Sequence, residues 1–322
     1  DRVVTVSPKA ASVGEASIDL KAGEKLTLDD LIYGAMLKSG NDACVAIAEH
    51  VAGTESNFVL LMNQKAKVLG ALNTSFINTN GLPATGHFTT ARDLAIITRY
   101  ALRNQSFQKA VSTRGKLIRS TEGERYLNNT NRLLWSYDGA NGVKTGTTVE
   151  AGECLVASAT RDGRQLINVV LHSEDRWSDS TTLLDYGFEC FDQVLALQEQ
   201  ESFGWIAVRE GTGDKVQAVV SNDLKVVIPK NRPDLIEKKV EITRELTAPV
   251  WDGQKVGRVI VSVNGIETES VDLVSDRYVE KLPFYRYIFK KGQQYYADGK
   301  GILFGITNTL KIAFWGGFYA DG

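Results

Sequence analysis

The sequence is poor in the residues that build metal sites and disulfide frameworks. Its 322 residues include three cysteines and three histidines, with no C-x-x-C, H-x-x-x-H or H-E-x-x-H spacing among them. A zinc site or a disulfide-stapled fold therefore has no support in the sequence. An excess of one charge is also missing: the formal net charge is -2, too small for the basic field on which nucleic-acid binding depends. We therefore expect no nucleic-acid partner.

The N-terminus shows no leader segment. The chain begins at Asp1, without the charged n-region or the apolar h-region of a signal peptide. We therefore expect any signal peptide to have been removed or to lie before Asp1. The hydrophobic and charged contents, 43% and 24%, are those of an ordinary globular protein. The length favours about two domains.

The first hundred residues are predicted to be mainly helical. Between residues 27 and 38, apolar side chains recur three and four positions apart behind a Thr27-x-x-Asp30 capping pattern. This helix ends at Ser39-Gly40-Asn41-Asp42, which places Ser39 and Asn41 on a tight turn before the next helix. The predicted helices cover residues 27–38, 43–51, 54–69 and 90–101.

The period of the apolar residues changes from residue 142 onward. A predicted strand over residues 142–148 is followed by two apolar runs joined at an Asp162-Gly163 turn, which indicates an antiparallel hairpin beside it. The spacing then becomes helical again until about Gln198. Helices, an antiparallel sheet and a final helix indicate an α+β domain over residues 1–198.

Beyond residue 198 the sequence consists of short predicted strands separated by Gly, Asn, Asp and Pro. This pattern predicts a small all-β domain over residues 199–280. The tail, residues 281–322, is rich in aromatics and largely apolar between Ile302 and Tyr319. We expect the tail either to lie in a membrane interface or to pack as a terminal element on the β domain. The predicted strands are 217–220, 225–228, 240–243 and 256–263.

Two short motifs carry residues suited to hydrolysis without a metal. Ser39-Gly40-Asn41 places a hydroxyl and a carboxamide on a turn, and Lys144-Thr145-Gly146 places an ammonium, a hydroxyl and a bare backbone position on a strand. Each tripeptide alone also fits ordinary structure, a helix cap with a turn or the end of a strand. Together, S-x-N and K-T-G belong to the signature of β-lactamases and penicillin-binding proteins, which also includes S-x-x-K.

The neighbourhoods of both motifs extend this similarity. Residues 31–43, 81–93 and 142–152 resemble low-molecular-mass penicillin-binding proteins of the D-alanyl-D-alanine carboxypeptidase type. The resemblance runs from Asp1 to about Phe191 and continues into the small β domain and apolar tail that such enzymes carry. It implies a penicillin-binding, β-lactamase-like transpeptidase domain of helices and antiparallel sheet. It also implies a serine acyl-enzyme mechanism without metal or cofactor.

The resemblance further implies a role for the first motif and for Lys144. An activated serine would attack the terminal D-Ala-D-Ala of a peptidoglycan stem peptide, with a neighbouring lysine as its base. Ser39 would pass a proton between that lysine and the leaving amine, and Asn41 would hydrogen-bond the substrate backbone. The charge of Lys144 would keep the pKa of the other lysine low and would help to orient Ser39.

The strand after Lys144 would bind the peptide as an added strand. The Thr147 amide would point at the developing oxyanion, and Gly146 would allow the substrate to approach closely. The substrate ends in a carboxylate and therefore needs a cation. Arg176 stands where similar carboxypeptidases place a carboxylate-binding arginine, and Thr145 would add a hydroxyl donor. A surface salt bridge is the alternative explanation of Arg176.

The nucleophile of the family has no counterpart at the expected place. It belongs to an S-x-x-K element before S-x-N, but only 38 residues precede Ser39 and none of their serines has a lysine three positions on. The one S-x-x-K in the chain, Ser106 with Lys109, follows S-x-N, and one such pair is expected by chance in this composition. We reject Ser106 and expect the nucleophilic serine and its lysine base upstream of Asp1.

Three functions follow from these features. The first is a penicillin-sensitive D-alanyl-D-alanine carboxypeptidase that meets stem peptides and β-lactam antibiotics outside the cytoplasmic membrane, in the periplasm or cell wall space. The second is a catalytically silent peptidoglycan-binding or scaffold protein that keeps the substrate groove and the tail. The third, a β-lactamase, is disfavoured by the extra β domain and by Gly40 in place of Asp.

Overall fold

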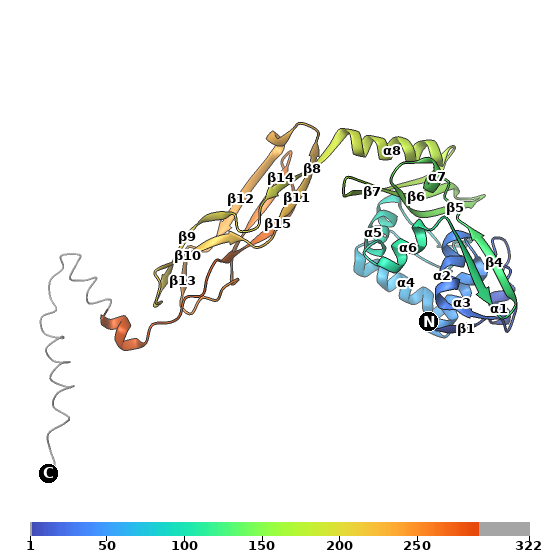
Figure 1. Ribbon diagram of the computed structural model, residues 1–322, viewed down its shortest axis with the longest axis horizontal. Helices are drawn as coiled ribbons and strands as arrows, with labels where there is room; N and C mark the ends of the chain where they lie inside the picture. The colour runs from blue at the N-terminus through green and yellow to red at the C-terminus, as the bar shows by residue number, and fades with distance from the viewer. Residues whose placement is uncertain (1, 290–322) are drawn as a thin grey trace, which may run out of the picture. The chain divides into compact units, whose positions relative to one another are not determined.

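The chain divides into two compact units, which we describe separately. In the computed structural model the first unit comprises residues 1–191 and the second unit comprises residues 192–322 (Figure 1). The structure describes residues 2–289 of the chain. The predicted domain boundary lies slightly later, at residue 198. The predicted interfacial segment, residues 302–319, lies outside the described residues. Over residues 2–289, no helix has both the length and the apolar character needed to cross a bilayer.

Most helices of the first unit begin at a residue whose side chain caps the helix. The Thr27 hydroxyl accepts a hydrogen bond from the Asp30 amide at 3.0 Å, and Thr54 and Thr90 cap two later helices in the same way. The predicted helices of the first hundred residues are therefore confirmed. The helices are α1 (Pro8–Ala11), α2 (Leu28–Leu37), α3 (Asn41–Ala52), α4 (Glu55–Leu69), α5 (Ala91–Ala101), α6 (Gln105–Ser112), α7 (Leu133–Ser136) and α8 (Arg176–Cys190).

One antiparallel sheet of the first unit was predicted. It has the strand order β5 (Ala140–Thr148), β6 (Gly152–Arg161) and β7 (Arg164–Ser173), which confirms the hairpin and the strand beside it. In this order β5 is an edge strand, and within β5 and β6 Gly146 lies opposite Cys154.

A second sheet of the first unit was not predicted. Its order is β1 (Val3–Thr5), β2 (Lys25–Thr27), β3 (Gly115–Ser120) and β4 (Gly123–Asn128), all antiparallel. The first two strands have only three residues each, too few for an alternating pattern to be visible. The sheet joins the start of the chain to residues more than a hundred positions later.

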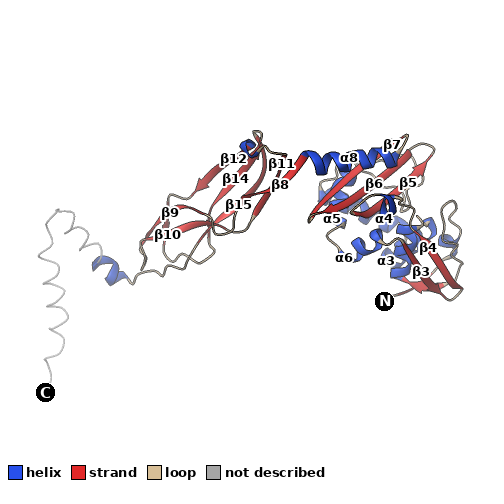
Figure 2. Ribbon diagram, turned by 45° about the horizontal axis from the view of Figure 1, so that its top comes forward, coloured by secondary structure: helices blue, strands red, loops and turns tan. Residues whose placement is uncertain are grey.

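Helices pack on both faces of the three-stranded sheet. Leu155 and Ala157 of β6 are fully buried in a cluster that includes Leu184 of α8. Val156, between them, points to the opposite face and packs with Val111 of α6. The sheet therefore lies between α8 on one side and α5 with α6 on the other (Figure 2).

The predicted final helix of the first domain is too long. We expected it to continue to about Gln198, but α8 ends at Cys190 and the chain enters strand β8 (Phe191–Leu197). β8 pairs with β11 (Leu224–Pro229), and Ala196 and Leu197 are buried in the core of the second unit. The apolar residues of 191–197 thus serve the second unit, which moves the division of the chain to residue 191.

The second unit is built from strands, as predicted. A six-stranded sheet packs its apolar face against the two-stranded sheet of β8 and β11, with Val216, Ala218 and Ile228 in the buried core. The sequence missed three of its strands, which are β9 (Ser202–Arg209), β13 (Glu245–Thr247) and β15 (Ile266–Ser275). The six-stranded sheet has the order β12 (Ile236–Ile242), β14 (Lys255–Val263), β15 (Ile266–Ser275), β10 (Lys215–Val220), β9 (Ser202–Arg209) and β13 (Glu245–Thr247).

Candidate active site

The turn between α2 and α3 carries the first motif. Ser39 has a φ of 59°, the left-handed conformation that residues with a side chain rarely adopt. The backbone is closed by a hydrogen bond from the Gly40 amide to the Gly34 carbonyl at 3.1 Å. A Cβ atom at residue 40 would lie 2.8 Å from an Asp42 carboxylate oxygen, so a side chain there would displace this carboxylate. The close packing leaves the half-buried Ser39 side chain with a defined direction.

Lys144 of β5 reaches this turn. Its Nζ atom donates a hydrogen bond to Ser39 Oγ at 2.9 Å and another to the Thr145 carbonyl at 2.8 Å. The two predicted motifs, 105 positions apart in the sequence, are therefore in direct contact. This contact joins the edge strand of the sheet to the helical part of the first unit.

The surroundings of Lys144 disfavour its charged form. Burial, with a smaller contribution from the positive charge of Arg176, lowers the pKa of Lys144 to about 8. Burial also raises the pKa of the Cys44 thiol, one turn into α3, to about 11. The pKa of Lys144 therefore lies nearer to neutral pH than that of an ordinary lysine, as is typical of groups that transfer protons.

Arg176, the first residue of α8, braces the far end of β5. Its Nη1 atom donates to the Gly146 carbonyl at 2.9 Å, to Thr147 Oγ1 at 2.8 Å and to the Cys154 carbonyl at 3.3 Å. Its Nε atom is buried and makes no hydrogen bond within residues 2–289, although it lies 3.6 Å from a Glu153 carboxylate oxygen. The guanidinium thus lies beside the second motif and has an N–H group, at Nε, that could donate a further hydrogen bond.

The surface over Gly146 is open. A Cβ atom at this position would meet only the Cβ of Cys154, at 4.0 Å, among the described side chains and backbone. The chain itself therefore does not require glycine here, whereas a ligand lying along β5 would approach the backbone more closely than a side chain allows.

Asn41 is bonded to the loop of residues 14–16. It is 4% exposed, its backbone amide donates to the Ala16 carbonyl at 2.8 Å, and its side-chain Nδ2 donates to the Gly14 carbonyl at 3.0 Å. It makes no hydrogen bond to Ser39 or Lys144 in the described part of the chain. The structure therefore brings together Ser39 with Lys144, and Thr147 with Arg176, but leaves Asn41 bonded to the loop behind the turn.

Thr130 belongs to the site and was missed in the sequence. Its hydroxyl lies 2.7 Å from the Thr145 hydroxyl, and its amide donates to the Leu37 carbonyl at the end of α2. The only signal was the asparagine-rich run around it, residues 128–131, which indicates a turn but no function. Ser106 and Lys109, the one S-x-x-K pair, are both exposed on α6.

The family of the chain follows from comparison with known proteins. The family model described as D-alanyl-D-alanine carboxypeptidase matches residues 1–175, more than half of the chain. The chain belongs to this family of low-molecular-mass penicillin-binding proteins. The model described as penicillin-binding protein 5, C-terminal domain, matches residues 191–281, which coincide with the β unit.

Individual carboxypeptidases of the family are similar over most of the chain. The chain is 34% identical to D-alanyl-D-alanine carboxypeptidase DacF of Bacillus subtilis, over 81% of its own length and 69% of the relative's. It is 35% identical to DacC of Escherichia coli, over 88% of its length and 73% of the relative's. The solved structure of penicillin-binding protein 5 from Haemophilus influenzae aligns with a TM-score of 0.74 and 30% identity, covering 87% of this chain and 83% of that one.

The state of Lys144 in this carboxypeptidase-family chain can be tested by titration. We predict that the 13Cε resonance of Lys144 titrates with a midpoint of about 8, because burial disfavours the charge. The folded pKa lies below the ordinary value of 10.5, so the unfolded chain binds more protons between these two values. The free energy of unfolding should therefore rise with pH across this window, relative to Lys144→Met. A midpoint near 10.5 would contradict the enclosed geometry.

Proposed function

We propose that the protein is a penicillin-sensitive, serine-type D-alanyl-D-alanine carboxypeptidase that acts on peptidoglycan stem peptides. The observation that carries the proposal is the hydrogen bond between Lys144 Nζ and Ser39 Oγ beside the edge strand β5. It joins a proton-transferring pair to a strand whose outer edge is available to a peptide. Family membership supports the same reaction. The site of action would lie outside the cytoplasmic membrane.

The reaction proceeds through an acyl-enzyme. A serine oxygen attacks the carbonyl carbon between the last two D-alanines, the C–N bond breaks, and the terminal D-Ala leaves as a free amine. Water then attacks the ester and releases the shortened peptide. We do not assign the nucleophile to Ser106 or its base to Lys109, because both are exposed on α6 and neither has a side-chain hydrogen bond to Ser39, Lys144 or Arg176 among residues 2–289.

Ser39 and Lys144 handle the proton of the leaving amine. The Ser39 hydroxyl donates to the departing nitrogen and would be reprotonated through Lys144 and the lysine base of the nucleophile. Lys144, already 2.9 Å from Ser39 Oγ, holds this hydroxyl in place. Asn41 supports the turn through its bonds to Gly14 and Ala16, and its side-chain oxygen would accept a hydrogen bond from the substrate backbone.

The outer edge of β5 holds the substrate. The peptide adds as a further strand over Gly146, with the Thr147 amide directed at the carbonyl oxygen that becomes negative in the transition state. The terminal carboxylate is bound by the Arg176 guanidinium. Hydrogen bonds to Gly146 and Thr147 hold this guanidinium at the end of the strand. The Thr145 hydroxyl, now paired with Thr130, adds a second donor.

Intact-mass measurement with benzylpenicillin tests the proposal. Protein expressed from the complete gene should gain one penicilloyl group, and Lys144→Ala should slow its formation by about 100-fold, the usual loss when a proton-transfer group is removed. The 322-residue chain serves as the matched control, and we expect it to gain no penicilloyl group. An adduct-free complete protein would instead favour a silent peptidoglycan-binding role, and rapid turnover of penicillin without a lasting adduct would favour a β-lactamase.

A second prediction separates two roles of Arg176, binding the substrate carboxylate and supporting strand β5. In Arg176→Gln, kcat/KM for a peptide ending in a free D-Ala carboxylate should fall about 10–100-fold more than for the same peptide ending in an amide. The amide substrate reports the loss of bracing at Gly146 and Thr147, which affects both peptides equally. Equal losses on the two peptides would show that Arg176 only supports the strand.

A further inference from the structure

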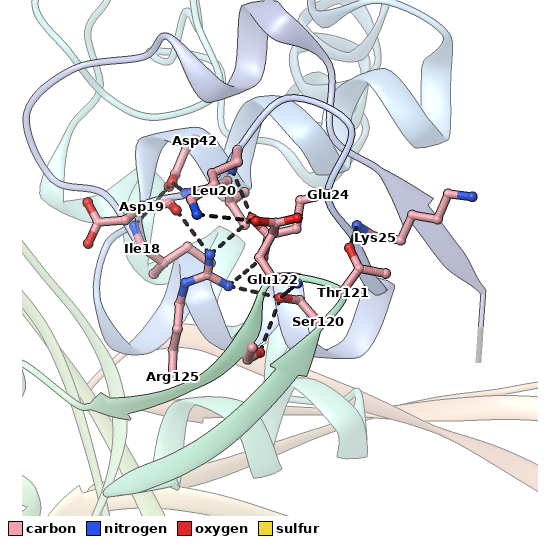
Figure 3. Close-up of polar contacts among 12 residues, drawn as sticks. Ile18, Asp19, Leu20, Glu24, Lys25, Asp42, Ser120, Thr121, Glu122 and Arg125 are labelled. Atoms are coloured by element: carbon pink, nitrogen blue, oxygen red, sulfur yellow. Dashed lines mark hydrogen bonds and ion pairs between the residues drawn. The ribbon is translucent and has the colours of Figure 1, made fainter.

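A buried carboxylate stands directly behind the turn that carries Ser39. Asp42 is 1% exposed, and its oxygens accept hydrogen bonds from the Ser17 hydroxyl at 2.6 Å, the Ile18 amide at 3.2 Å and the Leu20 amide at 3.0 Å. It forms no salt bridge within residues 2–289. A further hydrogen bond comes from the Ala43 amide at 2.9 Å, within α3 itself, and the others hold one segment, residues 17–20, against the start of α3 (Figure 3).

The held segment packs against the turn itself. The Cδ1 atom of Ile18 lies 2.6 Å from where a Cβ of Gly34 would be, and its Cγ2 atom lies 3.2 Å from the corresponding point at Gly40. The adjoining residues Gly14 and Ala16 accept the two hydrogen bonds of Asn41. Movement of this segment would therefore remove the backing of the turn on which Ser39 lies.

The opposite side of the segment is anchored to β4. Arg125 forms a bidentate ion pair with the fully buried Glu24, at 2.5 and 3.0 Å, and also donates to the Asp19 carbonyl at 3.0 Å (Figure 3). Burial alone would raise the pKa of Glu24, but the hydrogen bonds from Arg125 and its neighbours hold it below the ordinary value. The segment is thus clamped between Asp42 on one side and Arg125 on the other.

The clamp offsets a conformational cost at Ser39. A left-handed conformation is disfavoured for a residue with a side chain and persists only where its surroundings impose it, as at Ser39. Resting on the proposed function, we propose that Asp42 is a positioning residue for catalysis: through residues 17–20 it holds Ser39 Oγ within hydrogen-bond distance of Lys144. Asp42 touches neither substrate nor the reacting atoms, so its effect passes through the turn.

The first test follows the geometry and needs no acylation. In the 322-residue chain, the 13Cε titration midpoint of Lys144 is compared in wild type, Ser39→Ala and Asp42→Asn. Asp42→Asn replaces one accepting oxygen by an NH2 group, which faces either the Leu20 amide or the Ile18 and Ala43 amides, so the hold on the segment is weakened. Its midpoint should shift in the same direction as that of Ser39→Ala and by at least half as much. No shift in Asp42→Asn overturns the inference, and so does a midpoint that Ser39→Ala leaves unchanged.

The matched control is Asp93→Asn. Asp93 is also a buried carboxylate, 2% exposed, that accepts from the Asn73 amide at 2.7 Å and the Thr74 hydroxyl at 2.8 Å. It clamps a different loop and makes no hydrogen bond to the Ser39 turn among the residues described. Asp93→Asn should lower stability to a similar extent but leave the Lys144 midpoint in place. An equal shift in this control would overturn a specific role of Asp42.

The second test measures the rate of acylation by a fluorescent penicillin in the complete protein. Asp42→Asn should still label every folded molecule, but the first-order acylation step should slow by about 10–100-fold, because small displacements of proton-transferring groups have such effects. A reduced labelled fraction with an unchanged rate would show that Asp42 only supports folding. Unlabelled wild type would defeat the proposed function, while the titration would still decide the role of Asp42.

Ser17→Ala covers the case in which Asp42→Asn does not fold. It removes only the 2.6 Å hydrogen bond between the partly exposed Ser17 hydroxyl and Asp42, together with the bond that this hydroxyl accepts from the Asp19 amide. The Lys144 midpoint should move in the same direction by a smaller amount, and acylation should slow by about 2–5-fold. An unchanged midpoint and an unchanged rate in Ser17→Ala would overturn the inference.

Discussion

The hydrogen bond between Lys144 and Ser39 is the contact on which the site depends. It joins the edge strand β5 to the turn between α2 and α3, two elements that lie 105 residues apart in the sequence. Neither motif forms a site alone, because the turn motif has no cation, and the Thr145 and Thr147 hydroxyls of the strand pair with Thr130 and Arg176 and not with Lys144. A proton-transferring pair exists only where the helical part and the sheet meet.

Holding this contact requires unfavourable features that the surrounding structure imposes. Lys144 is enclosed enough that its pKa falls to about 8, and Ser39 has a left-handed backbone. The turn is backed by Ile18, whose segment is clamped by Asp42, while the far end of β5 is braced by Arg176. Strain of this kind concentrates at functional sites, where the geometry of the reaction outweighs the local cost.

Local signals predicted the elements that carry the site, and non-local contacts account for what was missed. The Thr27 cap and the Ser39-Gly40-Asn41 run indicated the helices and the turn, but only the family resemblance linked Ser39 to Lys144. Thr130 was missed because its partner, Thr145, is close only in the fold. The end of α8 was misplaced because the apolar residues of 191–197 fit a helix as well as a strand in the sequence alone. They are apolar because β8 completes the core of the second unit, a contact with residues far along the chain.

A crystal structure of the chain with a stem peptide ending in D-Ala-D-Ala tests the central claim most directly. We predict that the peptide lies as an added strand along β5, with its carboxylate at Arg176 and with Lys144 Nζ remaining about 3 Å from Ser39 Oγ. A peptide bound away from β5, or a bound state in which Lys144 and Ser39 have separated beyond hydrogen-bond distance, would contradict it.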